Sequence, residues 1–178
     1  ERARLDFVEP ALAGLSAKLG VLLFQISPLP SSWWKRMPEL IERLHVMLNT
    51  IRYVREQAPD VIVAVEVRDA QWLTPQFTHA LRETGTTYGL GLHAKMPPIN
   101  EQLPILRALW PGPLVCRWNL NPLHGAFGYE EAQRQYAPYD RLVDPDLGTR
   151  AALAKVIAGT AVAGQHVYVA LSNKAEGS

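Results

Sequence analysis

Residues 61–68 read VIVAVEVR and alternate with a period of two. The valines at 61, 63, 65 and 67 fall on one face of the predicted strand, and Ile62, Ala64, Glu66 and Arg68 fall on the other. A strand that is apolar on both faces for most of its length is typical of a parallel sheet covered by helices. We therefore expect the valine face to pack against helices, and Ile62 and Ala64 to face the inner side of the sheet.

The rest of the chain alternates between segments that predict strands and segments that predict helices. Apolar runs predict strands at 21–27, 86–92, 114–119 and 166–173. Amphipathic or capped segments predict helices at 8–19, 38–57, 74–85, 129–136 and 149–162, with one more ending near Trp110. Thr74 is the predicted N-cap of the helix that begins at Pro75, and Gly85 is its predicted end.

The order of these elements predicts an α/β fold. Helices separate the strands and no hairpin signal such as Asn-Gly joins two of them, so the crossovers should be right-handed and the strands parallel. A doubly wound sheet and a (β/α)₈ barrel both fit this pattern. Periodicity alone does not choose between them; a barrel would place the five strands adjacent in chain order.

Polar residues stand near the carboxyl ends of the predicted strands. They are Gln25, Glu66 and Arg68, Arg117 and Asn119, and Asn173. Ligands bind at the carboxyl edge of parallel sheets, in open sheets and barrels alike. We expect the charged ends of Glu66, Arg68 and Arg117 around one concavity, with Gln25 and Asn173 on its wall.

A structural interpretation of the same residues stays open. Burying a charge without a partner costs several kcal/mol, so Glu66 could serve only to neutralise Arg68 or Arg117. Gln25 and Asn173 could be structural hydrogen-bonding groups, and Asn119 could only begin a loop.

Several of these segments together resemble the YecE-like family of bacterial and archaeal proteins. They are LLFQISPLP, AVEVRDAQWL, LVCRWN and VYVALSNKAEGS, which supply Phe24, Gln25 and Pro28, then Val65, Glu66, Arg68 and Trp72, then Arg117, and finally Asn173 and Gly177. The resemblance implies a TIM-barrel-like domain of unknown function, in which we expect the five strands to be adjacent in chain order. The chain lacks the Gly-Trp motif of the family's first strands. The resemblance therefore implies that residues 1–178 are one (β/α) barrel domain, incomplete at its N-terminus and covering about strands four to eight.

The chain departs from the family pattern at its histidines. The family's Arg-x-His-Gly reads Arg-Trp-Asn-Leu here, which puts Asn119 where the histidine would stand. A Leu-His-Gly occurs instead at 123–125, and His93 lies where the family tends to carry Asp. The sequence assigns no role to either histidine.

Composition narrows the classes of function. The chain has 178 residues, 48% hydrophobic and 20% charged, with a net charge of +1. This near-neutral charge argues against a nucleic-acid partner. No apolar run reaches the ~20 residues of a membrane-spanning helix. Cys116 is the only cysteine, which excludes an intrachain disulfide and favours a reducing, cytoplasmic setting. Alternation with Arg117 places Cys116 towards the helices, and we expect it to be buried and inert.

Other chemical signals are weak. GLGLHA at 89–94 is a poor dinucleotide fingerprint, because KMPPI follows where a helix should begin. The spacing of His93, His124, Glu66 and Asp69 gives no support for a metal site, and none is predicted. Trp72 follows a strand end and could wall a pocket with Trp33 and Trp34, or could cover the core.

The sequence leaves three functions open. The first is an enzyme acting on a small polar or anionic metabolite, with Glu66 as general acid or base, Arg68 and Arg117 orienting an anionic group, and Gln25, Trp72, Asn119 and Asn173 contacting the substrate. The second is a non-catalytic metabolite-binding or scaffold module. The third is a metal-dependent enzyme that processes nucleic acid or sugar, which rests on fold analogy alone. The residues name no cofactor and no oligomeric state.

Overall fold

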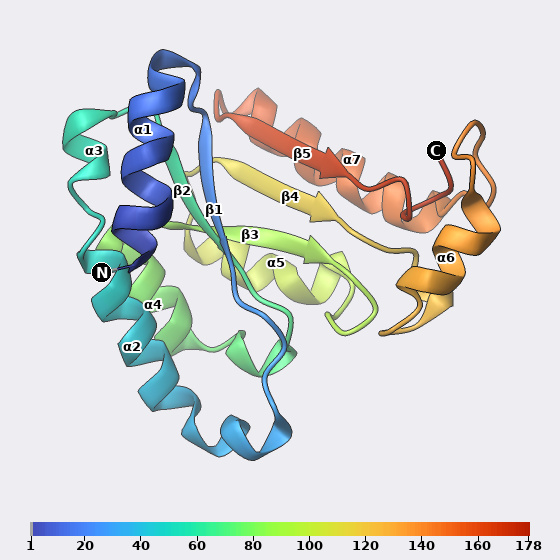
Figure 1. Cartoon of the computed structure of the whole chain (residues 1–178), viewed down its shortest axis with the longest axis horizontal. Coiled ribbons are helices and arrows are strands. Elements are labelled where there is room, and N and C mark those ends of the chain that lie inside the picture. Colours follow the sequence, from blue (N-terminus) through green and yellow to red (C-terminus); the bar gives the residue numbers. More distant parts are fainter. Residues whose placement is uncertain (1) are drawn as a thin grey trace.

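The computed structural model describes residues 2–178 and contains one sheet of five parallel strands (Figure 1). The strands are β1 (Val21–Gln25), β2 (Ile62–Glu66), β3 (Thr87–Leu92), β4 (Leu114–Trp118) and β5 (Val167–Leu171). Every neighbouring pair is parallel, and the order in the sheet is β1-β2-β3-β4-β5. The predicted topology of adjacent parallel strands in chain order is confirmed.

The strand order decides between the two architectures that the sequence left open. A doubly wound sheet reverses its strand order at a switch point, whereas this sheet runs in one direction from β1 to β5. The sheet is also curled. A Cβ atom on Gly20, just before β1, would lie 3.2 Å from the ring of Tyr168 on β5, although three strands lie between them. The fold is therefore a half-barrel.

The helices other than α6 form the outer layer of this half-barrel, and seven α-helices are described in all. They are α1 (Glu9–Leu15), α2 (Met37–Asn49), α3 (Val54–Gln57), α4 (Pro75–Thr84), α5 (Ile99–Ala108), α6 (Tyr129–Tyr136) and α7 (Leu147–Val162). Helix α2 packs on α4, α4 on α5, and α5 on α7. Helix α6 lies apart, beyond the carboxyl ends of β3 and β4 (Figure 1).

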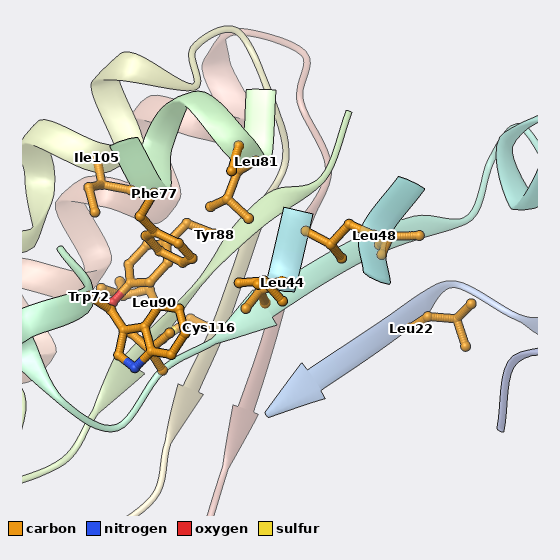
Figure 2. Packing of buried hydrophobic residues seen from close by; sticks show 14 of the residues in the cluster. Leu22, Leu44, Leu48, Trp72, Phe77, Leu81, Tyr88, Leu90, Ile105 and Cys116 are labelled. Atoms are coloured by element: carbon orange, nitrogen blue, oxygen red, sulfur yellow. The ribbon is translucent and has the colours of Figure 1, made fainter. Parts of the chain in front are cut away.

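The main core lies between the sheet and these helices. Val61, Val63, Val65 and Val67 are all buried in it, as predicted. The strand register places the same face of every strand in this layer, because Val65 aligns with Tyr88, and Leu90 aligns with Cys116. Figure 2 shows Tyr88, Leu90 and Cys116 packed beside Phe77 of α4. Cys116 is buried, as predicted.

Capping and breaks define the helix boundaries. The Thr74 side chain accepts a hydrogen bond from the backbone N–H of Phe77, and Gly85 ends α4 with φ +65°, so both predicted caps of this helix are confirmed. The predicted helix 38–57 is two helices, because α2 ends at Asn49. The hydrophobic period continues across the break, since Ile51 and Val54 are both buried. The break therefore leaves no trace in the pattern.

Candidate functional site

The polar ends of β1, β2 and β4 meet on the inner face of the half-barrel. The Glu66 carboxylate is at the centre: Oε1 lies 2.7 Å from Arg68 Nε, and Oε2 accepts a hydrogen bond of 2.9 Å from Arg117 Nη1. Asn119 Nδ2 donates to Oε1 at 3.2 Å. The Arg68 contact is an ion pair rather than a directed hydrogen bond, because the Nε–H group finds no acceptor in line. Both carboxylate oxygens are thus engaged.

Gln25 joins the two arginines from the other side. Its Oε1 accepts a hydrogen bond of 3.1 Å from Arg68 Nη2 and one of 2.9 Å from Arg117 Nη1. Gln25 pairs with Glu66 in the strand register, which puts the two side chains side by side on one face. The structure therefore brings together five of the predicted site residues: Gln25, Glu66, Arg68, Arg117 and Asn119.

Two glycines on β3 make this meeting across the sheet possible. Glu66 is on β2 and Arg117 is on β4, so β3 lies between them. Gly89 pairs with Glu66, and Gly91 pairs with Arg117. A Cβ on Gly91 would lie 3.5 Å from Glu66 Oε1, so the carboxylate occupies space above the glycine. A large side chain at this position would stand between the acid and the arginine.

Hydrogen bonds from the helix layer hold β3 in place behind the site. Gln102 of α5 is fully buried and donates a hydrogen bond of 3.1 Å to the backbone carbonyl of Gly91. Its Oε1 accepts one of 2.6 Å from the hydroxyl of Tyr88. Burial raises the pKa of Tyr88, with the negative charge of Glu66 acting in the same direction, so the phenol stays neutral. This network anchors Gly91 without reaching the inner face.

Arg68 also contacts α6, which the sequence placed after a long loop. Its Nη1 donates a hydrogen bond of 3.1 Å to the hydroxyl of Tyr129, the first residue of α6. The Tyr129 ring stacks on His93 with a centroid distance of 5.6 Å, and Lys174 Nζ lies 5.8 Å from the same ring. Residues following β2, β3 and β5 therefore converge on Tyr129.

A cavity of about 320 Å³ opens beside Arg68. Its lining comprises Gln25, Pro28, Arg68, His93, Lys95, Ala126, Phe127 and Tyr129. Among the residues that the structure describes, this lining includes two cationic side chains and no acidic one. Arg117 does not line the cavity but shares Gln25 Oε1 with Arg68. The volume is at the low end of the range of roughly 300–1,000 Å³ for small-molecule sites.

Burial and nearby positive charges keep the side chain of His93 neutral. Its pKa is lowered from 6.5 to about 4, first by burial and then by the charges of Arg68 and Lys95. The imidazole is therefore neutral at pH 7. The backbone N–H of Lys95 donates to His93 Nδ1 at 3.1 Å, which makes Nδ1 the acceptor and leaves the proton on Nε2.

Two predicted site residues lie elsewhere. Of the two positions that the sequence left open for Trp72, a pocket wall or the core, the structure shows the core: Trp72 is buried between the sheet and the helices, with its ring 5.8 Å from that of Phe77 (Figure 2). Asn173 is exposed in the turn after β5, and its backbone carbonyl accepts from Gly177. It follows Leu171, which pairs with Trp118 on the helix-facing side of the sheet. Alternation from β5 therefore put Asn173 on the wrong face.

The sequence did not assign several residues of the site. Gly91 was seen only as part of a weak nucleotide-binding pattern, and Tyr129 only as the start of the predicted helix 129–136. His93 directly follows β3 in the same alternation as Gly89 and Gly91, whereas Lys95 and Phe127 lie farther beyond strand ends, where alternation carries no information. The glycines could have been found from the strand itself, because Gly89 and Gly91 fall on one face of the predicted strand 86–92.

Metal and membrane signals add nothing to this site. Within residues 2–178, no group of three or more His, Cys, Asp and Glu side chains is placed to hold a metal ion. None of the helices in that range combines the length and the apolar character that crossing a bilayer requires.

Comparison with known proteins places the chain in a family. The model of the family described as "Protein of unknown function DUF72" matches residues 1–178. The chain belongs to the DUF72 family. No curated protein and no solved structure matches it. The family assignment agrees with the expectation of an uncharacterised family, while its description names no reaction and no ligand.

Proposed function

We propose that this DUF72 protein binds a small organic anion at the carboxyl edge of its half-barrel. The observation that carries the proposal is the charge balance at the centre of the site. Two guanidinium groups, of Arg68 and Arg117, face the single carboxylate of Glu66. The remaining acceptors of the cluster, Gln25 Oε1 and the Tyr129 hydroxyl, are neutral. One positive charge is left over.

This surplus charge is costly where it lies. Glu66 is the one carboxylate paired with both guanidinium groups, and of these the Arg68 side chain is only 8% exposed while that of Arg117 is 34% exposed. A buried charge that is not fully neutralised is unfavourable. Lys95 adds a second positive charge to the same cavity. An anion bound beside Arg68 would neutralise the surplus and would accept charge-assisted hydrogen bonds, which are about twice as strong as neutral ones.

Binding is supported better than acid–base catalysis by Glu66. A general acid or base must come within hydrogen-bonding reach of the atom that it protonates or deprotonates. The Glu66 side chain is 1% exposed, and Arg68, Arg117 and Asn119 occupy both of its oxygens. We therefore assign Glu66 the role of holding the two arginines in position, with Arg68 contacting the ligand.

The resemblance noted in the sequence suggests a finer classification. We propose that the half-barrel corresponds to part of a TIM-barrel-like domain of the YecE-like family, with its strands equivalent to about strands four to eight. The agreement of Gln25, Glu66, Arg68 and Arg117 in one cluster supports this, since these residues carry the resemblance. The single cysteine supports a reducing compartment.

Isothermal titration calorimetry with inorganic phosphate, sulfate and acetate at constant ionic strength tests the proposal. The wild-type protein should bind at least one of these anions, and Arg68→Met should abolish the binding. Arg52→Gln is the matched control, because it removes the same charge from an exposed residue outside the cavity. The proposal is wrong if no anion binds, or if Arg52→Gln weakens binding as much as Arg68→Met does.

A further inference from the structure

We propose that the cavity beside Arg68 recognises an oxyanion through a neutral donor, the Nε2–H group of His93, in addition to its cationic side chains. This inference rests on the proposed anion binding and adds the class of ligand and the residue that selects it. It begins with His93, a residue that lines the cavity and is only 6% exposed.

The tautomer of His93 is set by the backbone. The N–H of Lys95 points at Nδ1 from 3.1 Å, so Nδ1 must present its lone pair. A neutral imidazole then carries its only proton on Nε2. Among residues 2–178, no side chain or backbone group accepts a hydrogen bond from this Nε2–H. It is a fixed donor without a protein acceptor.

The ring orientation of His93 is also fixed. Tyr129 stacks on the imidazole at 5.6 Å with an interplanar angle of 25°, and Tyr129 is itself tied to Arg68 through its hydroxyl. Since the Tyr129 oxygen accepts from Arg68, its own proton is directed away from that bond. A second neutral donor therefore stands at the same cavity.

These groups together define what the ligand must offer. Arg68, Lys95, His93 Nε2–H and the Tyr129 O–H are all donors, and the acceptor of the cavity wall, Gln25 Oε1, already serves two arginines. A cation would face the two positive side chains Arg68 and Lys95, and these side-chain donors favour a ligand that accepts hydrogen bonds. A group with several oxygen acceptors and negative charge fits, which means a phosphate, sulfate or carboxylate group.

A histidine held neutral suits this role better than a charged one. A neutral imidazole donates a directed hydrogen bond without adding to the positive surplus already at Arg68 and Lys95. The low pKa of His93 agrees with this, because burial and these two cations keep the ring neutral in the empty site. Binding of an anion would relieve the repulsion by the cations and should raise that pKa.

Nitrogen NMR of the histidine side chains tests the tautomer directly. The wild-type spectrum at pH 7 should show His93 protonated on Nε2, and saturating phosphate should shift the Nε2 resonance while leaving Nδ1 nearly unchanged. His79→Gln serves to remove an exposed histidine signal as an assignment control. A proton on Nδ1, or an Nε2 resonance unmoved by an anion that calorimetry shows to bind, would overturn the inference.

Two variants separate the donor from the ring. His93→Phe keeps the stacking on Tyr129 but has no donor, and should bind phosphate at least roughly tenfold more weakly, as expected for a lost hydrogen bond to a charged group. His93→Gln retains an N–H donor and should recover part of this loss. Equal affinity of His93→Phe and wild type would refute the donor role even if anion binding itself is confirmed. Absence of anion binding in the wild type would instead remove the proposed function.

The same titrations identify the source of the oxyanion. Phosphate or sulfate binding more tightly than acetate would indicate a phosphorylated or sulfated ligand, whereas preference for acetate would indicate a carboxylic acid. In either case His93→Phe should weaken binding of the preferred anion more than binding of the others, because the anion that fits best is the one whose oxygen is aligned with the Nε2–H donor. An equal loss for all anions would show that His93 supports the cavity without selecting its ligand.

Discussion

Replacing Glu66 by Gln tests whether the charge cluster stabilises the protein through one carboxylate. Gln has nearly the same shape but no charge, so Arg68 and Arg117 would face each other without a counter-ion. Removing one partner of a buried ion pair costs about 3–5 kcal/mol. Gln can still accept one hydrogen bond and Arg117 is 34% exposed, so we expect the lower limit, about 3 kcal/mol.

This loss is large enough to measure in a thermal melt. For a domain of this size, about 1 kcal/mol shifts the melting temperature by roughly 2–4 °C. Glu66→Gln should therefore melt roughly 6–12 °C below the wild type, followed by circular dichroism. Added phosphate should recover part of the difference, because a bound anion supplies the missing negative charge.

The surface of α2 offers a control with the same composition. Glu39 lies between Arg36 and Arg43, at 2.7 Å from each, but its side chain is 43% exposed. Exposed ion pairs contribute little because solvent screens them, so Glu39→Gln should change the melting temperature much less than Glu66→Gln does. Equal shifts for Glu66→Gln and Glu39→Gln would refute the reasoning, since burial would then have no effect. An unchanged melting temperature for Glu66→Gln with lost turnover on an identified substrate would instead favour acid–base catalysis.

Three further predictions follow from the described contacts. Gly91→Ala should be tolerated, because its Cβ would meet Glu66 only at ordinary distances of 3.4 Å and more. Gly91→Val should weaken both anion binding and stability, although Val favours strands, and a Gly91→Val protein that is stable and binds the anion would contradict the spacing argument. The folded-state pKa of His93 lies below its unfolded value, so the unfolded chain binds more protons between pH 6.5 and 4, and stability falls as the pH drops through this window. Urea denaturation at several pH values should show a smaller fall for His93→Gln. Burial, and then the charge of Glu66, raises the pKa of Cys116 to about 12, so a thiol reagent at pH 8 should label the native protein far more slowly than the urea-unfolded one; rapid native labelling would show that this core region opens.

Elements that rest on a repeated pattern could be predicted from the sequence. The alternation of residues 61–68 identified a strand with two apolar faces, and the structure buries its valines against helices. Helix 129–136 was predicted at its observed bounds. Strand order could not be predicted from periodicity, because the pattern of a strand indicates which of its faces are buried but not which strands lie next to it. The resemblance to a barrel family supplied that information.

The two predicted site residues that lie away from the cluster, Trp72 and Asn173, both follow the end of a strand. Alternation fixes which way a side chain points only while the backbone remains extended. Trp72 lies in a short helical turn after β2, and Asn173 lies in a turn after β5. Their positions depend on loop geometry that no two-residue period describes. Glu66 and Arg117, which lie within strands, were placed on the correct face.

The strand spacing explains why large side chains on β3 would be incompatible with this site. Neighbouring strands lie about 4.8 Å apart, so residues on β2 and β4 start nearly 10 Å apart across β3. Glu66 Oε2 and Arg117 Nη1 nevertheless approach to 2.9 Å. They can do so only by leaning over β3 from both sides, where Gly89 and Gly91 present backbone alone. The ion pair thus depends on Glu66 and Arg117 and also on the two glycines between them. A search for charged residues at strand ends finds the ion-pair partners but not the glycines.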